Sequence, residues 1–329
     1  MQTAHFFHQP CKSIFVACGM LCMLLASACS DSNNSNLFII DPPNGGLTGC
    51  ADSNSCASNP ALQVGGERPA QVLIPSDYTT STRYPLVIVL HGYGASGLVQ
   101  SAYLGLDTRV DSQQYILVMP DGTENNSGQK FWNATPACCA PPVPEFQVDD
   151  VAYIRSLITQ AAATYSIDPA RIGLIGHSNG GFMSLRMACE ASDLVTSVVS
   201  LAGSTFIDDA SCAPTSHPVS VLAMHGDEDK TIRYGGGETP WGPYPGAAET
   251  IERFAAHAQC NTSNPTLAPN RDVDASIAGA ETRVLEYSGC PQGVDVTLWT
   301  LVGSPHVPFP WVPDALDSMV DWMLEHPRQ

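Results

Sequence analysis

The stretch IGLIGHSNGG at positions 172–181 decides the fold of this chain. Its first four residues form an apolar run typical of a buried strand, and a G-x-S-x-G turn centred on Ser178 follows directly. Because Gly176 and Gly180 carry no side chain, the strand and the next helix can pack closely around a sharp elbow. In such a turn the serine hydroxyl stands exposed above the sheet, so the stretch predicts a serine nucleophile that attacks an acyl carbon.

Apolar runs on both sides of this stretch predict further strands of the same sheet. Strands buried on both faces, as is typical of parallel sheets, are expected at 85–90, 115–119, 195–201, 219–224 and 294–302. An early edge strand is expected at 71–75. Helices are expected at 150–165, 178–190, 247–258 and 313–325. The alternation predicts a single doubly wound α/β domain with a mostly parallel sheet over residues 63–329, whose ligands bind at the carboxyl ends of the strands.

Two later segments supply the partners that a serine hydroxyl needs, since it is a poor nucleophile at neutral pH. The sequence HGDED at 225–229 follows one predicted strand, and GSPH at 303–306 follows the last. In hydrolases of this architecture the order along the chain is serine, acid, histidine. We therefore predict Asp229 as the acid and His306 as the base. Asp227, which lies closer to its strand, is the rival acid.

The other histidines of the domain have structural interpretations. His225 is expected to shape the acid loop through backbone hydrogen bonds, and His177 to pack inside the elbow. His217 lies before a predicted strand and His257 inside a predicted helix, so both are expected to be surface or structural residues. Only His306 lies at a late strand end beyond the acid, which favours it as the base.

Two backbone N–H groups are expected to bind the oxyanion of a tetrahedral intermediate. Asn179 follows the nucleophile at a helix N-terminus, where the helix dipole also favours negative charge. The second donor should come from the loop HGYG at 91–94, and we predict the Tyr93 N–H. The ring of Tyr93 would then line the acyl site.

Several further segments match a known family when they are taken together. They are FWNA at 131–134 with Cys138 and Cys139, VDDV at 148–151, DPAR at 168–171, GHSNGG at 176–181, YGGG at 234–237, and Cys260 with Cys290. From about residue 63 onward the chain thus resembles the secreted polyhydroxybutyrate depolymerase and feruloyl esterase group of α/β-hydrolases. The resemblance implies this fold, serine esterase activity and the triad Ser178, Asp229, His306. It also suggests that Trp132 lines the cleft, although a lone tryptophan is as often a core residue.

The chain departs from the family pattern at two places. The family often has a cysteine after the first His-Gly, whereas Tyr93 stands there and is similar to the tyrosine of cutinase-like polyester hydrolases. The family base commonly lies in a G-G-H-x-W-P-G stretch, whereas this chain reads GSPHVP at 303–308. Both departures lie at the expected substrate cleft. They are therefore expected to change which substrate binds more than which reaction takes place.

The N-terminus is expected to direct export and not to belong to the fold. Residues 13–28 form an apolar stretch too short to span a bilayer comfortably, and LASAC at 25–29 resembles a bacterial lipoprotein signal. We predict a signal peptide over 1–28, lipidation of Cys29 and a flexible tether over 29–62, rich in Ser, Asn, Gly and Asp at its start. A plain secretory signal and an uncleaved anchor are the alternatives.

Eight cysteines follow Cys29, and an even set in an exported chain implies disulfides. Pairs of Cys50 with Cys56, Cys189 with Cys212, and Cys260 with Cys290 are plausible, whereas Cys138 and Cys139 could pair with each other or elsewhere. No CxxC or His-rich spacing supports a metal site, and no cofactor is expected.

Composition limits the class of partner. Hydrophobic residues make up 44% and charged residues 14% of the chain, which favours a folded core, and the net charge is −18 at pH 7. Such an acidic chain is not expected to bind nucleic acid, or to touch a membrane except through a lipid anchor. We expect a monomer whose partner is an ester substrate, either small or polymeric.

Three functions compete for this constellation. An ester hydrolase would act on polyester chains, feruloylated polysaccharide or short acyl esters, and its cleft would include Tyr93, Trp132, Trp241 and Tyr244. The segment 235–246, which carries Trp241, is a candidate rim or lid. A peptidase on the same fold would need an extra domain, and a non-catalytic surface-anchored binding protein would be expected to lack a triad residue.

Overall fold

The computed structural model of the protein describes residues 62–212 and 217–328. All of them belong to the second of two compact units, Cys56–Gln329. The predictions that lie outside the described residues are the signal peptide (1–28), the lipid site Cys29, the tether (29–62, apart from its last residue) and the pairing of Cys50 with Cys56.

The described residues form a ten-stranded main sheet. Its strands, in spatial order, are β1 (Gln63–Val64), β2 (Ala70–Leu73), β4 (Ile116–Met119), β3 (Tyr84–Leu90), β7 (Ile167–His177), β8 (Ser197–Leu201), β9 (Ser220–Gly226), β14 (Val296–Leu301), β13 (Thr282–Ser288) and β12 (Asn261–Arg271). All neighbouring pairs from β4 across to β14 are parallel, and the pairs at both ends are antiparallel. The predicted α/β class with a mostly parallel sheet is confirmed.

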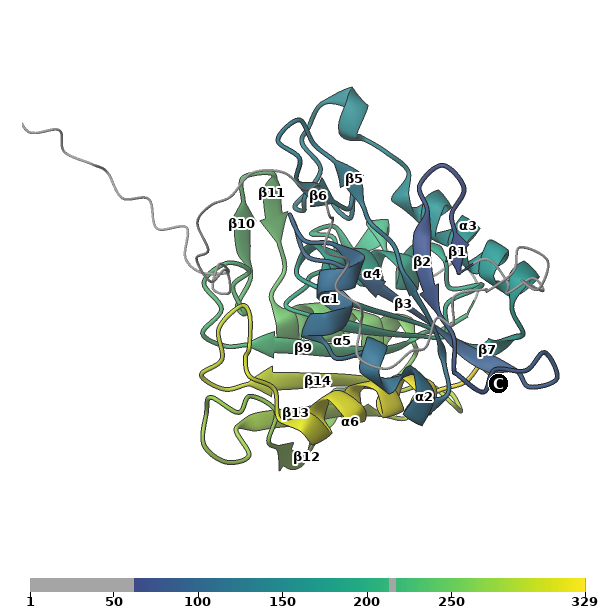
Figure 1. Cartoon of the computed structure of the whole chain (residues 1–329). Helices are drawn as coiled ribbons and strands as arrows, with labels where there is room; N and C mark the ends of the chain where they lie inside the picture. Colours follow the sequence, from purple (N-terminus) through teal and green to yellow (C-terminus); the bar gives the residue numbers. More distant parts are fainter. Residues whose placement is uncertain (1–61, 213–216, 329) are drawn as a thin grey trace, which may run out of the picture. The chain divides into compact units, whose positions relative to one another are not determined.

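Helices cover both faces of this sheet. They are α1 (Gly97–Tyr103), α2 (Val110–Gln113), α3 (Asp150–Thr164), α4 (Asn179–Glu190), α5 (Ala247–His257) and α6 (Pro313–Leu324), with short 3₁₀ turns η1 (Asp107–Arg109), η2 (Pro144–Phe146) and η3 (Asp209–Ser211). Figure 1 shows α1, α2 and α6 in front of the sheet and α4 and α5 behind it. Asp149 caps α3 as expected, because its carboxylate accepts the Ala152 N–H at 2.9 Å.

Strand β3 shows why the sheet is covered on both sides. All seven of its residues are buried, as expected for a continuous apolar parallel strand. Leu86, Ile88 and Leu90 join the core beneath α3, α4 and α5, whereas Val87 and Val89 join the core beneath α6. The two-residue period of the strand therefore feeds two separate hydrophobic cores.

Several elements were not expected from the sequence. Strand β12 has a polar, exposed sequence, NTSNPTLAPNR, and so lacks an apolar pattern. Strand β13 does alternate between buried and exposed residues and could have been found. Strand β2 was expected at the edge, but the two-residue β1 pairs outside it. Two hairpins stand apart from the main sheet: β5 (Thr123–Glu124) with β6 (Lys130–Phe131), and β10 (Gly237–Thr239) with β11 (Gly242–Tyr244).

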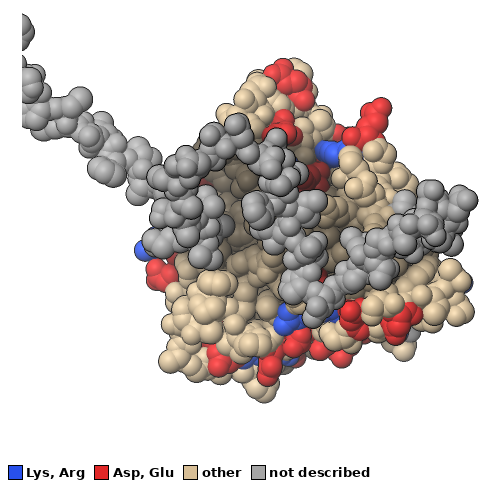
Figure 2. Space-filling view, in the orientation of Figure 1, with Lys and Arg blue, Asp and Glu red and all other residues tan. Residues whose placement is uncertain are grey.

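Three disulfides occur among the described residues. Cys189 pairs with Cys212 and Cys260 with Cys290, which confirms both predicted pairs. Cys138 pairs with its neighbour Cys139, which is one of the two options that the sequence left open. Within the described ranges, no helix combines the length and apolarity that crossing a bilayer requires. Figure 2 shows that Asp and Glu are more frequent than Lys and Arg on one face, in keeping with the net charge.

Candidate active site

Ser178 lies at the junction between β7 and α4, as the sequence predicts. Its φ of 55° is in the left-handed region, which is uncommon for a residue with a side chain and marks a strained turn. A Cβ at Gly176 would overlap the backbone of Gly180, and a Cβ at Gly180 would overlap the Leu90 carbonyl at the end of β3. Glycine is therefore required at both positions if strand and helix are to meet here.

Asp229 and His306 form a close pair above the sheet. The Nδ1 atom of His306 lies 2.6 Å from Oδ2 of Asp229, and only 4% of the Asp229 surface is exposed. The backbone N–H groups of Thr231 and Ile232 also donate to this carboxylate, at 2.8 and 2.9 Å. Burial raises the pKa of Asp229, but the hydrogen bonds from His225 and His306 outweigh burial and lower it well below its usual value. The ionised carboxylate fixes the proton of His306 on Nδ1 and leaves Nε2 able to accept one.

The rival acid Asp227 has a different position. Its Oδ1 atom accepts the backbone N–H of Gly303 at 2.6 Å, and its other oxygen lies 3.9 Å from Arg283. Asp227 therefore links the acid loop to the loop that carries the base, while Asp229 alone contacts the imidazole. The expected role of His225 is confirmed, because its Nε2 donates to the Ile232 carbonyl at 2.7 Å.

His177 brings the base loop next to the elbow. Its Nε2 donates to the His306 carbonyl at 2.8 Å, and the two rings are 4.9 Å apart between centroids. Burial, together with the electrostatic effect of the neighbouring His306, lowers the pKa of His177 to about 3. It is therefore a neutral donor that packs inside the elbow, as predicted. The Ser178 hydroxyl itself is half-buried and makes no hydrogen bond within the described residues, so its bond to His306 is not formed in this state.

The two backbone donors expected to bind an oxyanion are both free to do so. Within the described residues, neither the Tyr93 N–H nor the Asn179 N–H has an acceptor. The loop after β3 packs against the elbow, since a Cβ on Gly92 would lie 3.6 Å from Cβ of Ser178. His91 stiffens this loop by donating from Nδ1 to the Gly92 carbonyl and accepting the Gly122 N–H on Nε2.

The prediction that Trp132 lines the cleft is wrong. Its side chain is 0% exposed, and its indole Nε1 donates to the His91 carbonyl at 3.0 Å. Its backbone N–H and C=O both bond the side-chain amide of Asn179, at 2.7 and 2.9 Å. A buried indole needs an acceptor for its N–H, and the His91 carbonyl supplies one. Trp132 therefore supports the oxyanion loop from beneath, and this use of the Asn179 side chain was not foreseen.

Tyr93 and Trp241 remain at the surface of the site. Tyr93 is half-buried, and its hydroxyl accepts from Asn125 Nδ2 and donates to Gln129 Oε1. Trp241 lies at the turn of the β10–β11 hairpin with its ring centroid 5.8 Å from that of Tyr93. Tyr244 is buried at 3% exposure and so does not line a cleft. The expected rim at 235–246 is tied to the neighbouring loop, because the Thr239 hydroxyl donates to the Ala137 carbonyl.

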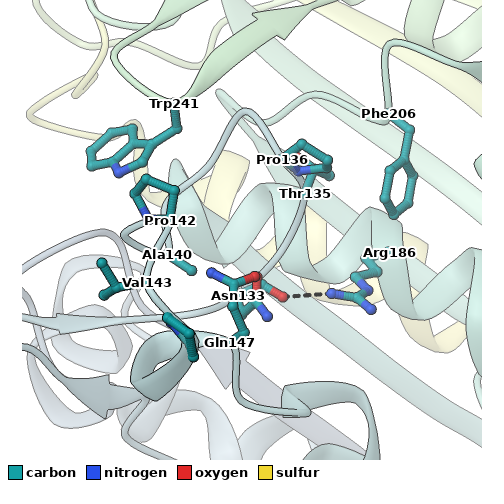
Figure 3. A pocket seen from close by; sticks show the side chains of 11 residues that line it. Asn133, Thr135, Pro136, Ala140, Pro142, Val143, Gln147, Arg186, Phe206 and Trp241 are labelled. Atoms are coloured by element: carbon teal, nitrogen blue, oxygen red, sulfur yellow. Dashed lines mark hydrogen bonds between the residues drawn. The ribbon is translucent and has the colours of Figure 1, made fainter.

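A cavity of about 820 Å³ begins at Trp241, and a second cavity measures about 390 Å³. Figure 3 shows Trp241 and Phe206 on opposite sides of it in this view, with Arg186 donating to the Asn133 carbonyl between them. Its walls are Asn133, Thr135, Pro136, Ala140, Pro142, Val143, Pro144, Gln147, Arg186, Phe206 and Trp241. The three predicted triad residues do not line it. Tyr93 connects the two regions, because it packs against Trp241 and against the cluster that contains Ala140.

Comparisons with known proteins agree with this geometry. Residues 62–281 match the family model described as "Putative esterase", a range that includes Ser178 and Asp229 but ends before His306. The chain is 26% identical over 282 residues to "Feruloyl esterase D" of Neurospora crassa, with 80% of this chain and 84% of that protein covered. It is 27% identical over 271 residues to "Putative esterase NocK" of Nocardia uniformis, with 73% and 74% covered.

Solved structures share the fold at low sequence identity. An acetyl xylan esterase from Aspergillus awamori superimposes with a TM-score of 0.57 and 15% identity, covering 79% of this chain and 97% of that one. A thermostable esterase gives a TM-score of 0.51 at 15% identity, covering 81% and 62%. The likeness confirms the fold expected from the elbow sequence.

Proposed function

Because this chain belongs to the esterase family and is a carboxylic ester hydrolase, we propose that it works through an acyl-enzyme formed on Ser178. The observation that carries this proposal is the buried 2.6 Å contact between His306 Nδ1 and Asp229. That contact leaves His306 Nε2 as the proton acceptor, and His177 links the base loop to the elbow of Ser178. No metal or cofactor takes part in the proposed reaction.

Each step then has a named group. As the Ser178 hydroxyl oxygen attacks the ester carbonyl, His306 Nε2 takes its proton and Asp229 stabilises the resulting imidazolium. The negative charge on the carbonyl oxygen is held by the N–H groups of Tyr93 and Asn179, where one donor is typically worth about 2.7–4 kcal/mol. The bond to the alcohol breaks as His306 returns the proton to the alcohol oxygen. A water molecule, activated by the same imidazole, hydrolyses the acyl-enzyme.

This mechanism is tested by trapping the enzyme with an alkyl p-nitrophenyl phosphonate. The phosphorus centre mimics the tetrahedral intermediate, so we expect release of one equivalent of p-nitrophenol and a matching mass increase on the peptide that contains Ser178. The acyl-enzyme would be refuted by an adduct on another residue. It would also be refuted if the enzyme, after prolonged treatment with the phosphonate, carried no label and still hydrolysed esters at the full rate.

We also propose that the substrate is an ester with a large and uncharged group, such as a feruloyl ester or a polyester oligomer. The cavity beside Tyr93 is far larger than an acetyl group needs, and proline, valine, phenylalanine and tryptophan side chains form much of its wall. Among the described residues that line it, the cationic residue Arg186 pairs with Glu190 at 2.8 Å, so its charge is already compensated. A feruloyl esterase and an acetyl xylan esterase stand among the similar proteins.

The cavity predicts a substrate-dependent effect of Trp241→Ala. We expect KM for methyl ferulate or a hydroxybutyrate oligomer to rise about tenfold, because losing an aromatic contact typically removes about 1.4 kcal/mol. Values for p-nitrophenyl acetate should stay within about twofold, since acetyl does not reach the cavity. Trp322→Ala on α6 is the matched control, and equal losses on short and long esters in Trp241→Ala would exclude this cavity as a binding site.

We further propose that the protein is exported and held at the bacterial cell envelope by a lipid on Cys29. The disulfides Cys189–Cys212 and Cys260–Cys290 support export, because such bonds persist in oxidising compartments. Fractionation of cells that produce wild type or Cys29→Ser tests the anchor. Only the wild-type chain should sediment with membranes, and equal sedimentation of both would rule the lipid out.

A further inference from the structure

The loop that carries His306 has few buried contacts of its own. It joins β14 to α6 (Figure 1), and most of its residues are exposed, including Val307 at 50% and Phe309 at 67%. Around the histidine, the buried points are Ser304 and Pro308, two residues before it and two residues after it, and Trp311 further along is buried as well. Besides the direct contacts of the histidine described above, the position of the imidazole therefore depends on what holds Ser304 and Pro308.

Both buried points are held by hydrogen bonds from distant parts of the chain. The Tyr103 hydroxyl donates to the Pro308 carbonyl at 2.9 Å. The Ser304 hydroxyl donates to Oδ2 of Asp274 at 2.7 Å, and both of these residues are 0% exposed. The Ser304 carbonyl also accepts the Glu228 N–H from the acid loop at 3.2 Å. Ser304 thus joins the base loop to the acid loop on one side and to Asp274 on the other.

Asp274 is an unusual residue to find in this place. It lies in the loop between β12 and β13, and its carboxylate accepts only neutral donors: the Ser304 hydroxyl, the Ser276 hydroxyl at 2.6 Å and the Ser276 N–H at 3.0 Å. Within the described ranges no Lys, Arg or His forms an ion pair with it. A buried charge without a charged partner is unfavourable for folding, so a gain elsewhere is expected.

The surrounding backbone fixes Asp274 in place. Ala275 N–H donates to the Pro310 carbonyl, and Val312 N–H donates to the Val273 carbonyl, so the two loops pair on both sides of Asp274 and Trp311. Glu281 accepts the backbone N–H groups of Val273 and Asp274 from the same loop. The carboxylate is therefore a rigid acceptor against which the base loop can be set.

We propose that Asp274 is a positioning residue of the active site, which acts through the Ser304 hydroxyl to hold His306 in register with Asp229 and Ser178. This rests on the proposed function, in which His306 is the base. A displacement of about 1 Å in a reacting group can reduce a rate by about a hundredfold. A hydrogen bond two residues from the imidazole can therefore affect the rate while leaving substrate binding unchanged.

A matched pair of serine variants tests the proposal. Ser304→Ala and Ser276→Ala each remove one hydroxyl that donates to the same carboxylate, but only Ser304 belongs to the base loop. We expect Ser304→Ala to lower kcat for p-nitrophenyl butyrate by about tenfold or more with KM within about twofold, and Ser276→Ala to stay within about twofold of wild type. Asp274→Ala should resemble Ser304→Ala, and the double variant should be little slower than either single one, because both changes break the same link.

Phosphonate labelling separates positioning from loss of folded protein. In Ser304→Ala, a loosely held base should lower the rate at which the phosphonate labels Ser178. The final extent of labelling, expressed per folded molecule, should still reach one equivalent. The proposal is overturned if Ser304→Ala labels at the wild-type rate, if only its extent falls, or if Ser276→Ala loses as much rate. Failure of the underlying mechanism looks different, since wild type itself would then not be labelled on Ser178. If Asp274→Ala does not fold, the serine pair alone decides the outcome.

Discussion

Replacing Ser178 with alanine should lower kcat for p-nitrophenyl butyrate by about 10⁴-fold or more, because it removes the atom that bonds to the acyl carbon. The fold should survive, since the Ser178 side chain makes no hydrogen bond to a described residue and alanine is smaller. Alanine also accepts the φ of 55° no worse than serine does. The measurement is a steady-state assay on the purified chain together with thermal unfolding.

The control for this change is a buried serine away from the site. Ser197→Ala removes a hydroxyl on β8 that donates to the Met323 carbonyl at 2.9 Å, far along the strand from its carboxyl end. It should lower the unfolding temperature and leave kcat nearly unchanged. Full activity in Ser178→Ala, with the phosphonate still reacting, would show that another residue is the nucleophile.

Asp229→Asn should have the second largest effect, a fall in kcat of about 10⁴-fold. An amide can present an N–H instead of an oxygen to His306, so the proton of the imidazole is no longer fixed on Nδ1. A neutral amide also cannot stabilise the imidazolium by charge. In the wild type the lowered pKa of Asp229 keeps its carboxylate ionised well into acid. An acidic limb in the pH–rate profile near neutrality should therefore report another group.

Asp227→Asn is the matched control, because it changes the rival carboxylate two residues away. Asp227 contacts the Gly303 N–H and not the imidazole, and an asparagine oxygen can still accept that bond. We expect a loss of about tenfold or less, from a shift of the base loop alone. A larger loss in Asp227→Asn than in Asp229→Asn would reverse the assignment of the acid.

The parts of the site that sequence predicts are those encoded by short local patterns. The elbow needs glycines on both sides of a serine, and Asp229 and His306 each follow an apolar strand, so the order and spacing were enough to find them. The disulfide partners Cys189 and Cys212 were found in a similar way, since each flanks a local element. Local rules of this kind require no knowledge of how distant segments pack.

The parts that were missed depend on distant packing. Whether Trp132 faces a cleft or the core is decided by the His91 carbonyl and the Asn179 amide, which lie 41 and 47 residues away. The link between Asp274 and Ser304 joins residues 30 positions apart, in loops whose sequences carry no shared motif. Polar contacts between loops leave no periodic signal in the chain, so only coordinates could identify them.

The polar strand β12 affects how copies of this chain can pair at high concentration. It is the outermost strand of the main sheet, and its outer backbone edge is a template on which another strand could add. Pro265 and Pro269 have no N–H to offer, and the strand pairs with β13 through two register shifts. An interrupted edge of this kind discourages copies of the chain from pairing edge to edge, so molecules at high local concentration can stay separate.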